Sequence, residues 1–383
     1  MRDSSLDGNQ DVRDGHADWG QVPSPTSAHW SILILSRHAT LAASSRLRTN
    51  QYVPFLRSKG ADVMVAPFFD ERYLRKLYES GGRDATDVAR GYLRRAMALA
   101  GLRRASVVWI EKEVFPFLPG FIEAIPARMG VRYVVDYDDA TFHTYDNNSG
   151  AFVRRALANK LDALLAGAQA VTAGSAYLEA YARTHGAKCV VRIPTVVDLT
   201  RYLVKARPAG DEIRIGWIGT PATTAYLQLL QEPLREVARS SRIRLVTVGA
   251  GKIAEFGVPL EQHAWSADTE AELLSTMAIG VMPLPDAPWE RGKCGYKLVQ
   301  YMAAGRPVIA SSVGANVDIV TPRVGILADG AAAWCAALRS LVENAGLRSR
   351  LGAQARKDVE AFYSLQATAP KVCAILARAA AVA

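Results

Sequence analysis

Short, wholly apolar runs alternate with longer helical segments along most of the chain, and this alternation constrains the fold more than any other feature. Each run is apolar on successive residues rather than on every second one, so both faces of the corresponding strand are expected to be buried. Strands of this kind separated by helices predict parallel α/β sheets covered on both faces. The expected strands are 31–35, 61–67, 106–112, 131–139, 170–174 and 188–194 in the first half, and 213–219, 243–249, 279–284 and 307–311 in the second.

Two domains are expected, because 383 residues exceed the usual length of one domain. The stretch 194–212 mixes proline with polar residues and separates the two strand–helix series. Residues 1–28 are polar, and we predict a disordered tail there rather than a signal peptide or membrane anchor. The other predicted boundaries are 29–198 for the first domain, 199–211 for the linker, 212–364 for the second domain and 365–383 for a final helix.

The composition indicates a globular protein with anionic partners. Half of the residues are hydrophobic, 22% are charged, and the formal net charge is +9. This charge favours phosphorylated substrates, acidic lipids or nucleic acid, but the basic segments lack the aromatics of a nucleic-acid groove. The four cysteines show no metal or disulfide spacing, which indicates a reducing compartment. No apolar run approaches the ~20 residues that span a bilayer, so we expect a cytoplasmic protein.

Residues 285–316 contain the clearest sign of a ligand site. The pattern predicts a proline-stiffened loop, a helix starting at Tyr296, a stop at 305–307 and a buried strand. Gly292 and Gly295 in the loop allow a tight turn or a close approach of the backbone to a ligand.

The same stretch places positive charge beside the start of that helix. A glycine-rich loop leading into a helix N-terminus offers backbone N–H groups to an anion, and Lys293 and Lys297 lie next to it. One turn further along, Gln300 can both donate and accept a hydrogen bond. The sequence therefore predicts a phosphate site with a polar side chain for a sugar hydroxyl.

This segment also resembles a known family. KLVQYMAAGRPVIAS, residues 297–311, followed by VGAN, is similar to the donor-binding element of retaining glycosyltransferases of the group 1 (family 4) type. The resemblance extends from about residue 30 to the end and is strongest in the second half. It implies the GT-B fold, in which two Rossmann-like domains with parallel sheets face each other across a cleft. The final helix of that fold commonly crosses back to the first domain.

The resemblance also implies an activity. A sugar would pass from a nucleotide diphosphate to a hydroxyl acceptor (a glycan, a lipid-linked acceptor or a small molecule), with retention of configuration and without a metal or other cofactor. The first domain would bind the acceptor and the second the donor. Cell envelope polysaccharide biosynthesis is one setting in which such an enzyme would work.

Two departures from the family pattern affect the donor site. The family has two glutamates eight residues apart, and this sequence has Gly292 and Gln300 there. By resemblance Gln300 holds the ribose, while the missing first glutamate leaves the sugar open. Lys293 and Lys297 are assigned to the leaving diphosphate, because no basic residue follows the first strand of this domain until Arg235. Further donor contacts are implied at Gly219, Thr220, Gly249, Gly292, Cys294, Gly295 and Tyr296.

Gly219 and Thr220 follow the strand IRIGWI in the string GWIGTPAT. This turn either caps the next helix or contacts a phosphate, and the resemblance favours donor contact. Gly249, Gly251 and Ala254 match the dinucleotide pattern G-x-G-x-x-A. That match leaves an NAD(P) oxidoreductase as an alternative, ranked below the nucleotide sugar.

Asp136, Asp138 and Asp139 end a predicted strand, where ligands bind in open parallel sheets. Asp136-x-Asp138 also spells the D-x-D of metal-dependent glycosyltransferases, and aspartates at strand ends often only form turns. The resemblance favours Asp138 and Asp139 contacting the donor sugar or the acceptor without a metal. His143 lies near enough in sequence to assist.

Arg46 and Arg48 follow the first strand, where guanidinium groups suit a phosphate or an acceptor, although a solvated helix face is the alternative. The segment 90–104 is rich in arginine and lacks acidic residues, with Leu93, Met97 and Ala100 as its expected buried stripe. Such a helix can lie peripherally on an anionic membrane at the inner face, although a solvated surface helix is more common.

Other functions share the same sequence evidence. The replaced glutamates allow a non-catalytic protein that binds a sugar nucleotide or a glycan. A nucleotide-sugar epimerase or hydrolase of the same fold is a further alternative. The formation of an acceptor-dependent product separates these from a transferase.

Overall fold

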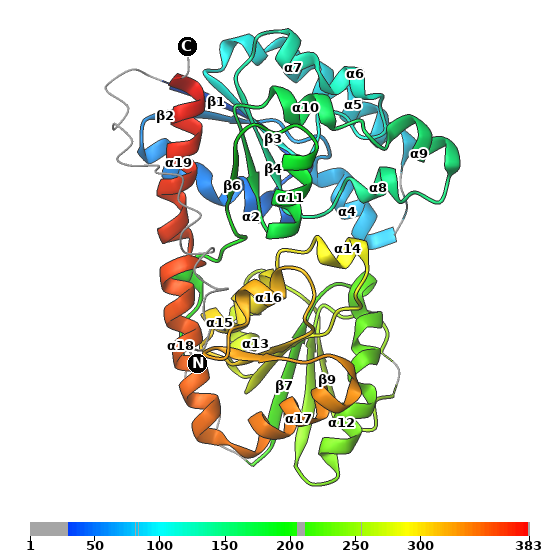
Figure 1. Ribbon diagram of the computed structural model, residues 1–383, viewed down its shortest axis with the longest axis vertical. Helices are drawn as coiled ribbons and strands as arrows, with labels where there is room; N and C mark the ends of the chain where they lie inside the picture. Colours follow the sequence, from blue (N-terminus) through cyan, green and yellow to red (C-terminus); the bar gives the residue numbers. More distant parts are fainter. Residues whose placement is uncertain (1–29, 81, 83, 205–210, 254, 382–383) are drawn as a thin grey trace, which may run out of the picture. The chain divides into compact units, whose positions relative to one another are not determined.

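The computed structural model describes residues 30–381 except 81, 83, 205–210 and 254 (Figure 1). The predicted N-terminal tail, part of the predicted linker and Ala254 lie outside the described residues. Contacts divide the chain into unit 1, comprising residues 1–195 and 368–383, and unit 2, comprising 196–367. No described helix is long and apolar enough to cross a membrane.

Unit 1 contains a six-stranded parallel sheet in the order β2-β1-β3-β4-β5-β6. Its strands are β1 (Trp30–Leu35), β2 (Ala61–Val65), β3 (Val107–Glu111), β4 (Tyr133–Tyr137), β5 (Ala170–Ala173) and β6 (Val190–Arg192). Every residue of β3 and β4 is buried, so both faces of these central strands are covered, as the apolar runs predict. In their register Glu111 lies opposite Asp136, so the carboxyl ends of the two strands meet at one edge of the sheet.

Helices and short 3₁₀ turns connect these strands. They are α2 (Ala43–Arg48), η1 (Asn50–Tyr52), α3 (Val53–Ser58), α4 (Glu71–Ser80), α5 (Ala85–Ala100), η2 (Leu102–Arg104), α6 (Gly120–Glu123), α7 (Ile125–Arg128), α8 (His143–Asp146), α9 (Ala151–Leu157), α10 (Asp162–Gly167) and α11 (Ala176–Thr184).

One expectation for α5 is wrong. Leu93 and Met97 are 61% and 62% exposed instead of forming the buried stripe. Gly91 and Arg95 face the interior: a Cβ on Gly91 would lie 2.9 Å from the Phe68 ring, and Arg95 Nη2 donates to a β1-end carbonyl at 2.5 Å. The helix therefore turns its small and hydrogen-bonded side inward and its larger apolar side outward.

Unit 2 contains a second six-stranded parallel sheet in the order β12-β11-β10-β7-β8-β9. The two parallel α/β sheets expected from the sequence are thus confirmed. The strands are β7 (Ile213–Ile218), β8 (Ile243–Val248), β9 (Leu260–His263), β10 (Ile279–Met282), β11 (Val308–Ala310) and β12 (Gly325–Leu327). The short edge strands β9 and β12 were not predicted, because neither is a long apolar run.

The helices of unit 2 are η3 (Leu199–Arg201), η4 (Pro221–Leu230), α12 (Gln231–Ala238), α13 (Glu270–Ser275), α14 (Pro288–Arg291), α15 (Tyr296–Ala303), α16 (Ala315–Ile319), α17 (Gly330–Glu343) and α18 (Ala345–Phe362). The last helix, α19 (Leu365–Ala381), begins in unit 2, and its residues from Thr368 onward are grouped with unit 1.

Tyr301 anchors α15 to the sheet of unit 2. Its hydroxyl accepts a hydrogen bond of 2.7 Å from the backbone N–H of Ile218 in β7. A Cβ on Gly280 of β10 would lie 2.2 Å from the Tyr301 ring, so only glycine leaves room for the ring there. These contacts, together with the buried Leu298 and Met302, fix where the N-terminus of α15 lies.

Candidate active site

The loop before α15 depends on Gly295. Its φ is +64°, in the left-handed region that glycine adopts readily. A Cβ there would also lie 2.3 Å from Cδ1 of Ile319. Gly292 and Cys294 are buried, while Lys293 and Tyr296 are half-buried. The backbone therefore makes a tight turn that ends at the positive end of the α15 dipole.

Lys297, in the first turn of α15, has an unusual environment. Its Nζ lies 4.7 Å from the centroid of the Trp217 ring and 3.5 Å from Oγ1 of Thr223. Burial and the nearby Lys293 lower its pKa to about 7. Within the described part of the chain, no carboxylate forms an ion pair with it. A desolvated amine that lacks a counter-ion is suited to bind an anion.

The turns after β7 and β8 lie against each other beside this lysine. A Cβ on Gly249, whose φ is +74°, would lie 2.5 Å from the carbonyl oxygen of Gly219. The backbone N–H of Gly251 donates to Oγ1 of Thr224 at 2.8 Å. Contacts between the two turns therefore account for the G-x-G pattern without a dinucleotide. The exposed Thr220 bonds Thr223 through its backbone N–H, at 3.1 Å.

Gln300 is buried and faces the interior of unit 2. It is 2% exposed, and its Nε2 donates to the hydroxyl of Tyr202 at 3.0 Å. That hydroxyl lies 3.4 Å from Glu270, which also accepts from the indole N–H of Trp265 at 2.7 Å. In this structure Gln300 thus presents no surface to a ribose. Trp265, at the other end of the chain of contacts, is 39% exposed.

In unit 1, a strained turn ends β3. Lys112 has a φ of +68°, and the N–H of Glu113 donates to the carbonyl of Glu111 at 2.8 Å. This is a three-residue γ-turn with a non-glycine residue at its centre, which is rare and unfavourable. Such strain is commonly found at functional sites.

The turn brings together charged side chains from the ends of β3 and β4. Lys112 Nζ lies 3.0 Å from Oδ1 of Asp138. The hydroxyl of Ser44, on α2, lies 2.7 Å from Oδ2 of Asp138 and 2.9 Å from Oε1 of Glu111. Burial opposes ionisation of Asp138, but Lys112 and Arg48 outweigh it and hold the Asp138 pKa below its usual value. Burial and the charge of Asp138 raise the pKa of Glu111.

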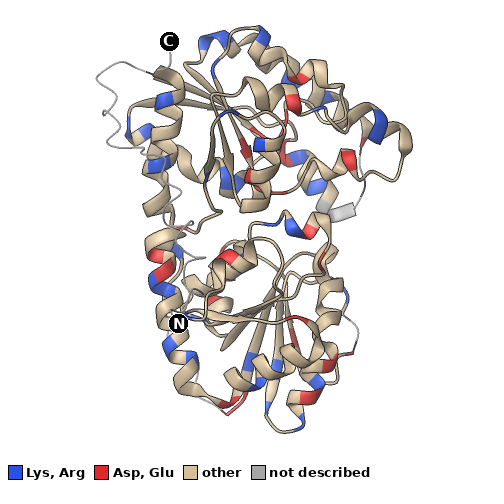
Figure 2. Ribbon diagram, in the orientation of Figure 1, with Lys and Arg blue, Asp and Glu red and all other residues tan. Residues whose placement is uncertain are grey.

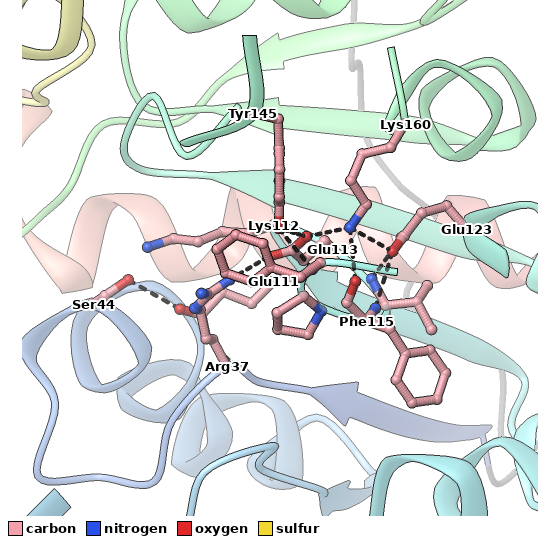
Figure 3. A network of polar contacts seen from close by, with 12 residues as sticks. Arg37, Ser44, Glu111, Lys112, Glu113, Phe115, Glu123, Tyr145 and Lys160 are labelled. Carbon is pink, nitrogen blue, oxygen red and sulfur yellow. Dashed lines mark hydrogen bonds and ion pairs between the residues drawn. The ribbon is translucent and has the colours of Figure 1, made fainter. Parts of the chain in front are cut away.

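A buried network supports the segment that follows the turn. Glu113 accepts from the Tyr145 hydroxyl at 2.6 Å and from Lys160 Nζ at 2.6 Å, and it also pairs with Arg37 (Figure 3). Burial alone would raise the pKa of Glu113, but the charges of Arg37 and Lys160 outweigh burial and lower this pKa.

Glu123 completes this support. Its two carboxylate oxygens accept from the N–H groups of Val114 at 2.7 Å and Phe115 at 3.0 Å. Lys160 Nζ lies 3.1 Å from Glu123 and donates to the carbonyl of Phe115 at 2.7 Å. The network holds the backbone after β3 rigidly, which keeps the γ-turn in place.

Arg48 and Asp136 form a buried pair instead of contacting a ligand. Nε and Nη2 of Arg48 donate to the two oxygens of Asp136 at 2.9 and 2.7 Å, and Nη1 donates to the carbonyl of Ile193 at 2.8 Å. The Arg48 side chain is 1% exposed, so it has no surface to offer a phosphate in this structure. Arg46 is half-buried and engaged in interactions of its own. The Asp136 carboxylate is likewise committed and unsuited to complete a D-x-D metal site.

The remaining predicted residues lie near the same edge. Asp139 is half-buried and accepts from the N–H of Ala140 at 3.0 Å. Both ring nitrogens of His143 are engaged, with Asp146 at 2.7 Å and the Tyr177 hydroxyl at 2.8 Å. Among the residues described, no group of three or more His, Cys, Asp or Glu could hold a metal ion.

Three residues of this cluster were missed by the sequence analysis: Ser44, Glu111 and Lys112. A signal was present, because the charged string Glu111–Glu113 directly follows an apolar strand that neighbours the strand ending in DYDD. Ser44, on α2, lies far from both in sequence and carried no comparable signal.

Comparison with known proteins relates part of the chain to one family. Residues 212–344 match the family model described as glycosyl transferases group 1. The matched residues all lie within unit 2. No curated protein sequence matches this chain.

Solved structures share its fold. HepE from Anabaena, in complex with UDP and glucose, aligns with a TM-score of 0.68 at 14% identity, over 91% of this chain and 100% of HepE. Sucrose-phosphate synthase from Thermosynechococcus elongatus gives a TM-score of 0.62 at 16% identity, over 90% and 97%. WaaG, a glycosyltransferase involved in lipopolysaccharide biosynthesis, gives a TM-score of 0.64 at 15% identity, over 90% of this chain and 99% of WaaG. The chain therefore has the GT-B fold.

Proposed function

We propose that this chain is a glycosyltransferase that moves a hexose from a nucleoside diphosphate sugar to a hydroxyl acceptor, with retention of configuration and without a metal ion. The observation that carries the proposal is Lys297, a desolvated amine at the start of α15 without a carboxylate partner among the described residues. A diphosphate in this position meets the lysine and the positive end of the helix dipole together.

The proposed chemistry uses that charge at the leaving group. The bond between the anomeric carbon and the phosphate oxygen breaks, and negative charge grows on the diphosphate. Lys297, Lys293 and the N-terminus of α15 stabilise it where it develops. The acceptor oxygen bonds to the anomeric carbon, and its proton passes to the departing phosphate. In unit 1, Asp138 and Asp139 bind hydroxyl groups of the acceptor or the sugar.

We further propose a uridine nucleotide as the donor. HepE has been solved with UDP and with UDP-glucose. The half-exposed indole of Trp265 lies beside the Gly249 turn, where a Cβ on the glycine would be 3.0 Å from the Trp265 Cβ. An exposed indole at the edge of a phosphate site provides a flat surface on which a base can stack.

The test is a thermal-shift panel of UDP-, GDP-, ADP- and TDP-sugars and NAD(P)H in the presence of EDTA. A ligand that binds the folded chain raises its unfolding midpoint. We expect a UDP-sugar to raise it in the wild type and in Lys357→Ala, which removes an exposed lysine of α18, but not in Lys297→Ala. A response to NAD(P)H alone, or to UDP-sugars only when manganese replaces EDTA, would contradict the proposal.

A group of exposed apolar side chains on unit 1 supports a second proposal, which is docking on an anionic lipid surface at the inner face of the membrane. Large apolar side chains are exposed on α5, on the segment after β3 and on α9: Leu93, Met97, Phe117, Phe121 and Phe152, the last 83% exposed. The Tyr92 hydroxyl bonds the carbonyl of Pro116 at 2.5 Å, which joins α5 to that segment.

Basic side chains accompany these apolar ones. Arg90 is exposed on α5, and Arg103 and Arg104 follow it. In Figure 2, α9 is partly blue and shows no red, as expected from its arginines Arg154 and Arg155. Exposed aromatic and aliphatic groups flanked by arginine are typical of surfaces that bind anionic lipid. A lipid-linked acceptor would suit such a surface.

Vesicle sedimentation tests this second proposal. We expect the chain to sediment with vesicles that contain phosphatidylglycerol, and to do so less at high salt. It should not sediment with vesicles of pure phosphatidylcholine. Combining Leu93→Ser with Met97→Ser should abolish binding. Met64→Ser, which changes an equally exposed residue of β2, should leave it intact. Equal loss in the control, or binding that ignores lipid charge, would refute docking through α5.

A further inference from the structure

The hydroxyl of Ser44 lies between two carboxyl groups. Its oxygen is 2.7 Å from Oδ2 of Asp138 and 2.9 Å from Oε1 of Glu111. A hydroxyl has one proton to donate, so it can satisfy one carboxylate at a time. If both were ionised, the second would face the lone pairs of Ser44 in a buried site, which is unfavourable.

We propose that Glu111 is held as a neutral carboxylic acid and positions Asp138 through Ser44. The proton lies on Oε1 of Glu111 and is donated to Ser44. Ser44 then donates its own proton to Oδ2 of Asp138, whose Oδ1 faces the ammonium of Lys112. Each donor in the chain thereby has one acceptor.

The other oxygen of Glu111 is already an acceptor. Its Oε2 receives hydrogen bonds from the Ser45 hydroxyl at 2.6 Å and from the backbone N–H of Arg37 at 3.0 Å. This leaves Oε1 as the natural position for a proton. The neutral acid therefore needs no change in the surrounding structure.

The surroundings place the proton on Glu111 rather than on Asp138. Glu111 is 1% exposed, and burial raises its pKa. Asp138 retains some exposure, and the ion pair with Lys112 keeps its pKa low. Raised and lowered pKa values on two neighbouring carboxyls are the usual result of such unequal environments.

The other charged groups around Glu111 are engaged elsewhere. Arg37, at the end of β1, pairs with Glu113. Arg95, from α5, donates to the carbonyl of Ser36. Lys112 pairs with Asp138, and its charge opposes the raised pKa of Glu111 without outweighing burial. The remaining ionisable groups nearby are Asp136, paired with Arg48, and His38, whose pKa is lowered to about 3 by burial and by Arg37 and Lys112. Glu111 forms hydrogen bonds with Ser44, Ser45 and the backbone N–H of Arg37 rather than with a cationic side chain.

Glu111 is thus a positioning residue that keeps Asp138 as the one anion of the pair. When the pH rises far enough for Glu111 to lose its proton, two anions compete for Ser44, and Asp138 loses its fixed orientation. The importance of this for catalysis rests on the proposed function, whereas the protonation state can be measured without any substrate.

Infrared spectroscopy of the full chain at pH 7 tests the proposal. A wild-type minus Glu111→Gln difference spectrum should contain the C=O stretch of a protonated carboxyl group. The glutamine keeps the same pattern, with its amide N–H donating to Ser44 and its oxygen accepting from Ser45 and Arg37. Glu111→Gln should therefore match the wild-type midpoint near pH 4, about the pKa of an unfolded glutamate, and exceed it at pH 7. The matched variant Glu113→Gln removes an ionised carboxylate that pairs with Arg37 and Lys160, and its unfolding midpoint should be lower than that of the wild type.

The pH dependence gives a second readout. Because the folded-state pKa of Glu111 is raised, the stability it contributes is present at low pH and is lost as pH rises. As the pH rises, the unfolding equilibrium constant of the wild type should increase by up to about tenfold per pH unit relative to that of Glu111→Gln, so the wild type becomes less stable. Absence of the protonated band, failure of Glu111→Gln to fold, or equal pH profiles would overturn the proposal.

Discussion

The near-neutral pKa of Lys297 makes nucleotide binding a proton-uptake reaction. The free chain has a Lys297 pKa of about 7. At pH 8, roughly one molecule in ten therefore carries the ammonium, whereas a bound diphosphate restores the charge. Binding at pH 8 should take up about 0.9 proton, and binding at pH 6 about 0.1. The affinity should fall by up to about tenfold per pH unit above pH 7.

Calorimetry measures this uptake directly. UDP is titrated into the chain at pH 6 and at pH 8, each in two buffers with different ionisation enthalpies. The dependence of the observed heat on the buffer gives the number of protons taken up. Lys297→Met should bind more weakly and take up no proton at pH 8. Lys357→Met, on the exposed side of α18, should behave as the wild type. Proton uptake near zero at pH 8, or unchanged in Lys297→Met, would contradict protonation of Lys297 on binding.

Three further predictions concern the folding of the two units. Gly295→Ala should lower the unfolding free energy of unit 2 by at least ~1–3 kcal/mol, because it strains a positive φ and clashes with Ile319; an unchanged denaturation curve would contradict this. Asp136→Asn should destabilise unit 1 by about 3–5 kcal/mol by leaving Arg48 buried without its anion; hydrogen exchange at β4 as slow as in the wild type would argue against it. Gln300→Glu, which introduces the family's residue, should lower the midpoint as pH rises above 6, because a carboxylate would replace an amide beside Tyr202 and near Glu270; a raised midpoint would disagree.

Regular, buried elements were predictable because their apolar runs are long enough to identify. The central strands and α15 with its glycine turn follow directly from patterns within a few residues. The edge strands β9 and β12 escaped, since their pairing depends on neighbours in the sheet rather than on their own composition. The pattern of apolar residues also could not predict the orientation of α5. Gly91 is buried because it packs against Phe68, and Arg95 is buried because it donates to the carbonyl of Ser36, just after β1.

The candidate site was predictable where its residues are adjacent in sequence. Lys293, Lys297 and the strand-end aspartates could be picked out because a loop or a strand end groups them. The burial of Arg48 and Gln300 could not be predicted, because each is held by a buried partner far along the chain. Arg48 pairs with Asp136, and Gln300 donates to Tyr202. The cluster of Ser44, Glu111 and Asp138 likewise exists only after three segments come together.

Turnover of the donor shows directly whether the chain is a sugar transferase. UDP-glucose and related nucleotide sugars are incubated with the chain in EDTA, with and without glycan and lipid-linked acceptors, and the release of nucleoside diphosphate is followed. We predict acceptor-stimulated release from a UDP-sugar, a product with the anomeric configuration of the donor by NMR, and loss of both in Lys297→Ala but not in Lys357→Ala. Tight binding of the sugar nucleotide without release under any acceptor, or release that ignores the acceptor, would contradict a transferase and favour the binding protein or the hydrolase.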